Sequence, residues 1–555
     1  MLKDEVIILF SEAASLPQYG YAAWKEFSHE VSVGNCRTKC FAAVWVIQNS
    51  HMIVERIYEW ANRQPDKTAV VFRDVSLSYR SFSNSIRAAC EFFKRENLPA
   101  GRTAVVLVEN RLDAWIIAMA LRALGLDTIP ASRISAVQSL KIKDVACIVA
   151  SHMEAPKRNL SSEVTGGAKV VIVPPLTYSG RDTGEMLLIE GDVRRFGGHI
   201  VYTSGTTGSL KKLMMSAEHE DRLNRERGQL HSFDSNTILH GIDYGLWTAI
   251  GSKFPPAIWH AGGCVVFDDR KEKFEHFFSH GVNFSMITPN VLKDLLEARG
   301  PSARPKEGFA IAVSGGFLSI DLAEQAVQTL TDSVTIIYGS TETNSIALRS
   351  RFRTIDDLHW LTPTNEKVFQ IIDENGRDCA VDQEGELRIQ LSDFDSHHYL
   401  DDEETSARVF RDGFFYPGDM AVRRRDGRIR ILGRTNDVII LYSQKFAAAP
   451  IEQAIQRLLK VDEVCLFSRL TDQGHEEVIV AIQSDRQIDR SDLEAVALEF
   501  GPSTIVRFSF LKEFPRTETG MRKTNRAALK KLIFKGTEMA LWVFYTGAIE
   551  IAALL

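Results

Sequence analysis

The sequence predicts an α/β protein with a large multi-layer N-terminal domain and a small α+β C-terminal domain. Three observations predict this class. The chain has 555 residues, which is too long for a single hydrophobic core. Strand and helix patterns alternate from about Ile53 onward, as in layered α/β proteins. A second set of elements begins after Arg434, and the residues that remain suffice for a separate small domain.

The first elements follow in a regular order. Apolar residues from Val54 to Ala61 recur at helical spacing, and Pro65 ends that pattern. Two short strands around a polar turn come next, then a helix, a buried strand and another helix. We expect these elements at Thr68–Phe72, Val75–Tyr79, Ser81–Arg95, Thr103–Val108 and Ala114–Leu124.

The C-terminal part repeats the alternation on a smaller scale. We expect helices at Pro450–Leu459 and Arg490–Phe500, with strands at Val464–Ser468 and Glu477–Gln483. The chain therefore divides into an N-terminal extension of unknown order (1–51), a large domain (52–434), a small lid domain (435–535) and an apolar tail (536–555). The tail carries Glu550 and is short for a membrane span, so we interpret it as a packing or interfacial helix and do not favour membrane contact.

Composition excludes several classes of function. The formal net charge is −6, which gives no attraction to nucleic acid or to anionic lipid. The seven cysteines have neither zinc-site nor dithiol spacing, which is typical of free thiols in a reducing compartment. The N-terminus lacks the pattern of a secretory signal. Together these features predict a cytoplasmic protein.

The strongest chemical signal is a loop rich in glycine and hydroxyl side chains. It follows the apolar Ile200-Val201 and reads Thr203, Ser204, Gly205, Thr206, Thr207, Gly208, Ser209, Leu210, Lys211. The glycines let the backbone approach a polyanion, the hydroxyls donate hydrogen bonds, and Lys211 adds a positive charge. The spacing differs from that of a Walker A loop, so the segment predicts a phosphate-binding loop of another kind.

This loop resembles the phosphate loop of the adenylate-forming (ANL) superfamily, which includes acyl-CoA synthetases, aryl and amino acid adenylating domains, and luciferases. The family loop has proline and glycine where this chain has Leu210 and Lys212. The resemblance covers roughly residues 52 to 534. It implies the ANL fold, in which the small C-terminal domain is mobile, and an enzyme that uses ATP and Mg²⁺.

Two further segments match the family between the loop and the small domain. Ser314-Gly315-Gly316 resembles the segment that borders the adenine and acyl pockets. Tyr338-Gly339-Ser340-Thr341-Glu342 resembles the turn in which, by family analogy, Tyr338 stacks on adenine, Thr341 contacts phosphate and Glu342 helps to hold Mg²⁺. A carboxylate beside a triphosphate needs a cation between them, and Mg²⁺ prefers oxygen ligands.

The remaining motifs lie around the start of the small domain. By the resemblance, Asp419 accepts hydrogen bonds from the ribose hydroxyls, Arg434 reaches the ribose or phosphate, and Asn436 is the hinge. The family's catalytic lysine normally follows directly after a glycine that matches Gly520. Here a two-residue insertion separates them, so we assign that role to Lys523, with Arg522 as a weaker candidate.

The implied reaction joins a carboxylic acid to ATP with release of pyrophosphate, and then transfers the acyl group to a thiol. CoA and the phosphopantetheine of a carrier protein in trans both remain open as acceptors, because the segment Leu441–Lys445 lacks the glycines common in CoA ligases. Asp243, Tyr244 and Gly316 are candidate residues of the acid pocket. We expect a fatty or aryl acid. Because of Asp243, a stand-alone amino acid adenylating enzyme remains an alternative. Because of the irregular segment around Lys523, a nucleotide-binding protein of the same fold with impaired catalysis is a second alternative.

Overall fold

The computed structural model describes most of the chain after the N-terminal extension. It describes residues 52–131, 134–152, 160, 165–176, 196–204, 210–242, 244–270, 272, 274–344, 346–364, 367–435, 437–441, 444–470, 476–500, 504–517, 523–535 and 541–545. The predicted extension (1–51) and the end of the tail (546–555) lie outside these residues.

The first large sheet ends in the hairpin that carries the phosphate loop. Its strand order is β6-β5-β3-β4-β7-β8, with all neighbours parallel except the β7–β8 pair. All five residues of β3 are buried, as expected for a parallel strand that is covered on both faces. The strands are β3 (Thr103–Leu107), β4 (Asp127–Pro130), β5 (Val145–Ser151), β6 (Lys169–Val173), β7 (His199–Ser204) and β8 (Leu210–Met215).

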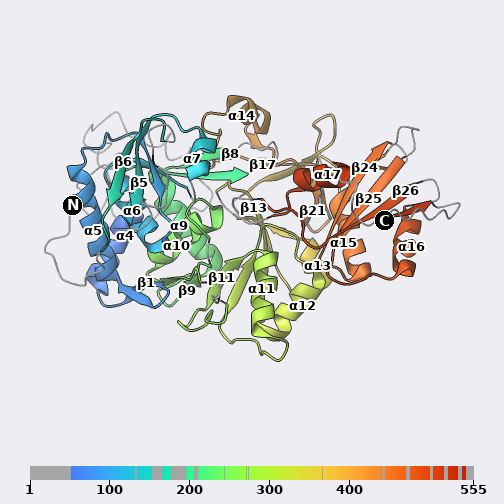
Figure 1. Cartoon of the computed structure of the whole chain (residues 1–555), viewed down its shortest axis with the longest axis horizontal. Coiled ribbons are helices and arrows are strands. Elements are labelled where there is room, and N and C mark those ends of the chain that lie inside the picture. Colours follow the sequence, from blue (N-terminus) through green and yellow to red (C-terminus); the bar gives the residue numbers. More distant parts are fainter. Residues whose placement is uncertain are drawn as a thin grey trace, which may run out of the picture.

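A second sheet of nine strands in the described part of the chain lies next to the first (Figure 1). Its order is β15-β14-β13-β12-β11-β9-β10-β1-β2, with a parallel centre and antiparallel edges. The strands are β1 (Thr68–Phe72), β2 (Val75–Ser78), β9 (Ile238–His240), β10 (Cys264–Phe267), β11 (Phe284–Ile287), β12 (Ala310–Val313), β13 (Ser333–Gly339), β14 (Ile346–Arg351) and β15 (Thr362–Pro363).

Helices pack between and around these sheets, most of them in one large hydrophobic core, whereas the helix Ile134–Leu140 shares a second, smaller core with one face of the first sheet. They are α4 (Ile53–Arg63), α5 (Tyr79–Arg95), α6 (Arg111–Ala123), α7 (Ile134–Leu140), α9 (Ala217–His231), α10 (Ala249–Ala261), α11 (Pro289–Arg299), α12 (Ile320–Thr329), α13 (Ile355–His359) and α14 (Glu403–Val409). Most begin at a Ser, Thr, Asn or Asp cap. In α10, for example, the Thr248 side chain accepts a hydrogen bond from the Gly251 amide.

A third, largely antiparallel sheet connects this core to the C-terminal part. Its order is β18-β19-β17-β20-β21, and β16 pairs with β17. The strands are β16 (Phe369–Ile372), β17 (Glu384–Gln390), β18 (Phe410–Arg411), β19 (Phe414–Phe415), β20 (Asp419–Arg423) and β21 (Ile429–Arg434).

The residues after β21 form a smaller α+β body with its own hydrophobic cluster, at the right of Figure 1. It contains the hairpin β22–β23 and the sheet β24-β25-β26-β27. The elements are β22 (Val438–Leu441), β23 (Gln444–Ala447), α15 (Ala448–Leu459), β24 (Glu463–Leu470), β25 (Glu476–Gln483), α16 (Arg490–Glu499), β26 (Ile505–Leu511), α17 (Arg526–Lys535) and β27 (Leu541–Tyr545).

The predicted elements agree with these bounds to within about three residues, with one exception in the tail. We expected a helix after residue 535, but Leu541–Tyr545 is a strand that pairs antiparallel with β26. A short run of aromatic and branched residues favours a strand once a sheet edge is available. Among the described residues, no helix is both long enough and apolar enough to span a membrane.

Candidate functional site

The phosphate loop connects β7 to β8 at the carboxyl end of β7. Thr203 pairs with Lys211 and Ser204 with Leu210 in the hairpin, so the two strands are hydrogen-bonded up to the residues that flank the loop. Gly205, Thr206, Thr207 and Gly208 lie outside the described residues. The ammonium of Lys211 lies 5.0 Å from the centre of the Tyr399 ring. Desolvation lowers the pKa of Lys211, and the charge of Glu342 opposes that shift.

The turn after β13 carries the predicted Mg²⁺ ligand. Tyr338 and Gly339 end the strand, and the Ser340 hydroxyl accepts a hydrogen bond of 3.2 Å from the Thr343 amide. Glu342 is buried, and its Oε1 accepts a 2.7 Å hydrogen bond from the hydroxyl of Tyr399. Tyr399 therefore contacts both Glu342 and Lys211, so the turn and the β7–β8 hairpin face one region.

Asp419 and Arg434 are direct neighbours across two strands. They occupy paired positions in β20 and β21, and the Arg434 Nε lies 3.2 Å from Asp419 Oδ1. The other oxygen, Oδ2, accepts a 2.5 Å hydrogen bond from the Tyr338 hydroxyl. Burial raises the pKa of Asp419, while Arg434 and the Tyr338 hydrogen bond act in the opposite direction. The structure thus brings the predicted adenine and ribose residues together.

Lys523 belongs to the small body and nevertheless faces these groups. Its carbonyl accepts a 2.8 Å hydrogen bond from the Thr517 amide, and Arg516 forms a β-bridge with Thr524. The Lys523 side chain is accessible to solvent, yet desolvation lowers its pKa because protein surrounds it on several sides. Arg434 lowers the pKa further, whereas Asp419 and Glu342 raise it. Lys523 therefore lies within the electrostatic range of both carboxylates. Arg522 lies outside the described residues.

The predicted acid-pocket residues that are described meet at one junction. The Tyr244 hydroxyl accepts a 3.1 Å hydrogen bond from the Thr288 amide. Gly315 has φ +86°, which favours glycine, and a Cβ on Gly316 would contact Pro289 at 3.5 Å. Tyr244 and Gly316 thus border the start of α11 together. Asp243 and the predicted hinge Asn436 lie outside the described residues.

Sequence reasoning missed two buried cations that hold the turn from behind. Lys253 in α10 donates a 3.1 Å hydrogen bond to the Thr341 carbonyl, and Arg227 in α9 donates a 2.8 Å hydrogen bond to the Asn344 carbonyl. Desolvation lowers the pKa of Lys253 to about 7. A lone lysine in the apolar helix α10 was a usable signal, but the polar sequence of α9 gives no reason to select Arg227.

Comparisons with known proteins agree with this arrangement. A family model described as AMP-binding enzyme matches residues 199–392, which include the phosphate loop and the Glu342 turn but not Asp419, Arg434 or Lys523. The chain is 25% identical over 505 residues to the mitochondrial acyl-coenzyme A synthetase ACSM4 of Rattus norvegicus, covering 84% of this chain and 85% of that protein.

A second relative is much longer than this chain. Bacitracin synthase 3 of Bacillus licheniformis is 23% identical over 513 residues, which cover 85% of this chain but only 8% of that protein. Among solved structures, O-succinylbenzoate coenzyme A synthetase (MenE) from Bacillus subtilis, in complex with ATP and a magnesium ion, shares the fold with a TM-score of 0.70 and 18% identity. That match covers 86% of this chain and 99% of the other.

Proposed function

Because the chain belongs to the adenylate-forming superfamily of AMP-binding enzymes, we propose that it activates a small carboxylic acid with ATP and passes the acyl group to CoA. The observation that carries the proposal is the convergence of Tyr338, Asp419 and Arg434 with Lys523 from the other body. A nucleotide-binding protein without catalysis has no need for a lysine brought to this position.

The nucleotide is held by groups on three sheets. Asp419 binds the ribose hydroxyls, and Tyr338 provides the aromatic surface for adenine. The amides and hydroxyls of the phosphate loop, with Lys211, bind the phosphate oxygens. Arg434, whose side chain is about half exposed at 49%, adds a positive charge beside the ribose and the α-phosphate.

Glu342 fits a magnesium site of the kind that substrate phosphates complete. Mg²⁺ is usually held by one or two carboxylates together with phosphate oxygens and water. Glu342 presents one carboxylate, oriented by Tyr399, and the described residues contain no larger cluster of metal-ligating side chains. The metal supplies charge neutralisation for the phosphates when bound.

In the first step, a carboxylate oxygen of the acid forms a bond to the α-phosphorus of ATP. The bond from that phosphorus to the bridging oxygen breaks, and pyrophosphate leaves with the electron pair. The ammonium of Lys523 stabilises the negative charge that accumulates on the α-phosphate, and such stabilisation depends on accurate placement.

In the second step, a thiol sulfur attacks the acyl carbon, the bond to AMP breaks, and the thiol proton passes to solvent. The small body swings about the Asn436 region between the two steps and withdraws Lys523. A carrier-protein phosphopantetheine is the second candidate acceptor. Similarity to bacitracin synthase 3 and the absence of glycine from Leu441–Lys445 both support it.

Carboxylate-dependent exchange of labelled pyrophosphate into ATP tests the first step. A panel of fatty, aryl and amino acids identifies the substrate class, and we propose a fatty or aryl acid. Exchange with amino acids alone supports the alternative of an amino acid adenylating enzyme. Absence of exchange with every acid, in a protein that binds ATP, contradicts the proposed activity.

Release of AMP with CoA, compared with release with a phosphopantetheinylated carrier protein, then identifies the thiol. We also propose a cytoplasmic location. The name of the rat relative assigns that protein to mitochondria, so fractionation of cells that express the full chain is the direct test.

A further inference from the structure

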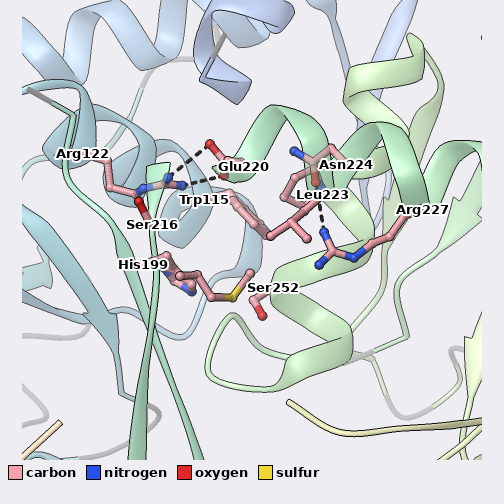
Figure 2. Close-up of a pocket in the computed structure, with 11 residues that line it drawn as sticks. Trp115, Arg122, His199, Ser216, Glu220, Leu223, Asn224, Arg227 and Ser252 are labelled. Atoms are coloured by element: carbon pink, nitrogen blue, oxygen red, sulfur yellow. Dashed lines mark hydrogen bonds and ion pairs between the residues drawn. The ribbon is translucent and has the colours of Figure 1, made fainter. Parts of the chain in front are cut away.

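A small cavity lies behind the site, lined by α6, α9, α10 and the paired residues His199 and Met215 of the β7–β8 hairpin (Figure 2). Its free volume is about 20 Å³. A cavity of this size holds one or two water-sized polar groups and no hydrocarbon chain. The residues that matter for its chemistry are Trp115, Arg122, His199, Glu220, Asn224 and Arg227.

The cavity adjoins both elements that are assigned to the acid. On one side, Arg227 donates a 2.8 Å hydrogen bond to the Asn344 carbonyl at the end of the Glu342 turn. On the other side, His199 Nε2 lies 3.1 Å from the carbonyl of Leu246, in the segment that follows Tyr244. The cavity is therefore one side chain away from the turn at which the acid is activated.

The cavity carries an excess positive charge. Arg122 and Glu220 form a two-point ion pair at 3.0 and 3.1 Å, so their charges cancel. His199 is uncharged at neutral pH because desolvation lowers its pKa to about 3. Arg227 is only 6% exposed, and no carboxylate of the described residues lies within 4.0 Å of its guanidinium. Glu226 and Glu220 act on the Arg227 charge only from a longer range, and a buried cation without a paired anion is costly.

The same cavity has a hydrogen-bond donor without a partner. Asn224 is 2% exposed, and its Oδ1 accepts a 3.3 Å hydrogen bond from Arg227 Nη1. That contact fixes the orientation of the amide, and Nδ2 has no partner among the described residues. The buried Nε1 of Trp115 also lacks one. One positive charge and two unused donors are the complement of a carboxylate.

We propose that this cavity receives the far carboxylate of a dicarboxylic acid, whose near carboxylate is the one activated by ATP. Arg227 and the Asn224 amide recognise the far carboxylate and so determine substrate specificity. The inference rests on the proposed function and narrows it, because an acid with an apolar far end would leave the Arg227 charge uncompensated.

The test on the unmodified full chain compares acids that differ only at the far end. Pyrophosphate exchange is measured with linear dicarboxylic acids of four to eight carbons, their monomethyl esters, and the monocarboxylic acids of equal length. We expect kcat/KM for the best dicarboxylic acid to exceed that of both analogues by about tenfold or more, the range for a hydrogen bond to a charged group. A wild-type protein that uses the ester or the monocarboxylic acid equally well overturns the inference while leaving acid activation intact.

Two variants assign the preference to the cavity. Asn224→Asp keeps the acceptor for Arg227 and replaces the unused donor by a carboxylate oxygen, so the preference should fall to about twofold or less while exchange with monocarboxylic acids persists. Because the new carboxylate has Arg227 as its partner, this variant avoids a loss of folding. Arg227→Gln should also lose the preference, but because it removes the hydrogen bond to the Asn344 carbonyl as well, we expect exchange with every acid to fall in this variant.

The matched control is Arg225→Gln, the same substitution two residues away on α9, where the side chain is 53% exposed and pairs with Asp221. It should keep the full preference for the dicarboxylic acid. An unchanged preference in Asn224→Asp rejects the cavity as the binding site. Absence of exchange with every acid rejects the proposed function, and this inference with it.

Discussion

The hydroxyl of Tyr338 donates a 2.5 Å hydrogen bond to the carboxylate of Asp419, although 81 residues separate the two in sequence. The bond joins the end of β13 in the large sheet to the start of β20 in the connecting sheet. The proposed adenine and ribose contacts therefore form one unit, and a change in either residue should affect the other.

Tyr338→Phe tests this unit, since it removes the hydroxyl and keeps the ring. We expect KM for ATP to rise about tenfold or more, the effect of losing one hydrogen bond to a charged group, with a smaller change in kcat. Initial rates of pyrophosphate exchange at varied ATP measure both constants. Tyr79→Phe is the matched control, because it loses a buried tyrosine hydrogen bond, to the Gly263 carbonyl, far from the site. It should lower stability and leave KM unchanged.

Lys523→Ala separates the two steps of the reaction. Pyrophosphate exchange should fall about a hundredfold or more, as when a donor to a developing negative charge is removed. Thioester formation from a supplied acyl-adenylate should change by less than about tenfold, since it requires no charge at that position.

Lys512→Ala is the control for the lysine, as it changes an exposed lysine of the same small body. The informative contradiction comes from Arg522→Ala. If that variant loses more exchange activity than Lys523→Ala, the catalytic cation is Arg522 and not Lys523.

His231→Phe addresses stability and its dependence on pH. His231 lies in an aromatic cluster, with ring centres 5.1 Å from Phe233, 5.5 Å from Phe254 and 5.2 Å from Phe284. Its Nε2 has no partner among the described residues. Desolvation, with help from Arg349 and Arg227, lowers its pKa from 6.5 to about 4.

Between those pKa values the unfolded chain binds a proton that the folded chain excludes, so stability falls as the pH decreases from 6.5 toward 4. The phenylalanine variant lacks this proton uptake. The difference in free energy of unfolding between the variant and the wild type should therefore be about 2 kcal/mol larger at pH 5 than at pH 7. This value corresponds to about 1.36 kcal/mol per pH unit over the roughly 1.5 units between pH 6.5 and pH 5. Urea unfolding at the two pH values measures it, and an equal difference at both would reject the explanation.

The ion pair between Lys293 and Asp462 should favour the orientation in which Lys523 faces Asp419. Lys293 lies on α11 of the large body, Asp462 lies in the small body, and the Nζ–Oδ1 distance is 2.5 Å. Both side chains are partly exposed, at 46% and 36%, so the pair contributes little: about 0.2–1 kcal/mol, or up to about fivefold in exchange rate.

Lys293→Glu should reduce pyrophosphate exchange by a factor within that range, and less so at high salt. The charge-swapped double variant with Asp462→Lys should recover the activity. If the double variant does not recover the activity, the ion pair does not favour the orientation in which Lys523 faces Asp419.

The sequence contains enough information for the parts of the site that local patterns specify. The phosphate loop follows a buried apolar strand, and the Glu342 turn follows another, so their positions at strand ends are predictable from the sequence. The positive φ of residue 315 explains why glycine occupies that position. The assignment of Lys523 and the division into domains remain predictions.

What the sequence hides are the contacts that only the tertiary fold creates. Arg227 has the same helical surroundings as the exposed Arg225, and only the packing of α9 against the turn distinguishes them. Tyr399 orients Glu342 from 57 residues away, which no spacing rule indicates. The prediction of a helix in the tail was wrong for a related reason, because a short apolar run forms a helix or a strand according to the elements beside it.

The bridge between Arg516 and Thr524 closes the base of the segment that precedes Lys523, and Lys523 lies at that base. Residues added between Thr517 and Lys523 therefore lengthen the chain between the paired positions and leave the lysine backbone where the pairing holds it. The position of Lys523 thus does not depend on the number of residues between it and Thr517. Insertions and deletions there should be tolerated, in evolution or by design, whereas a change at the pair itself displaces the lysine.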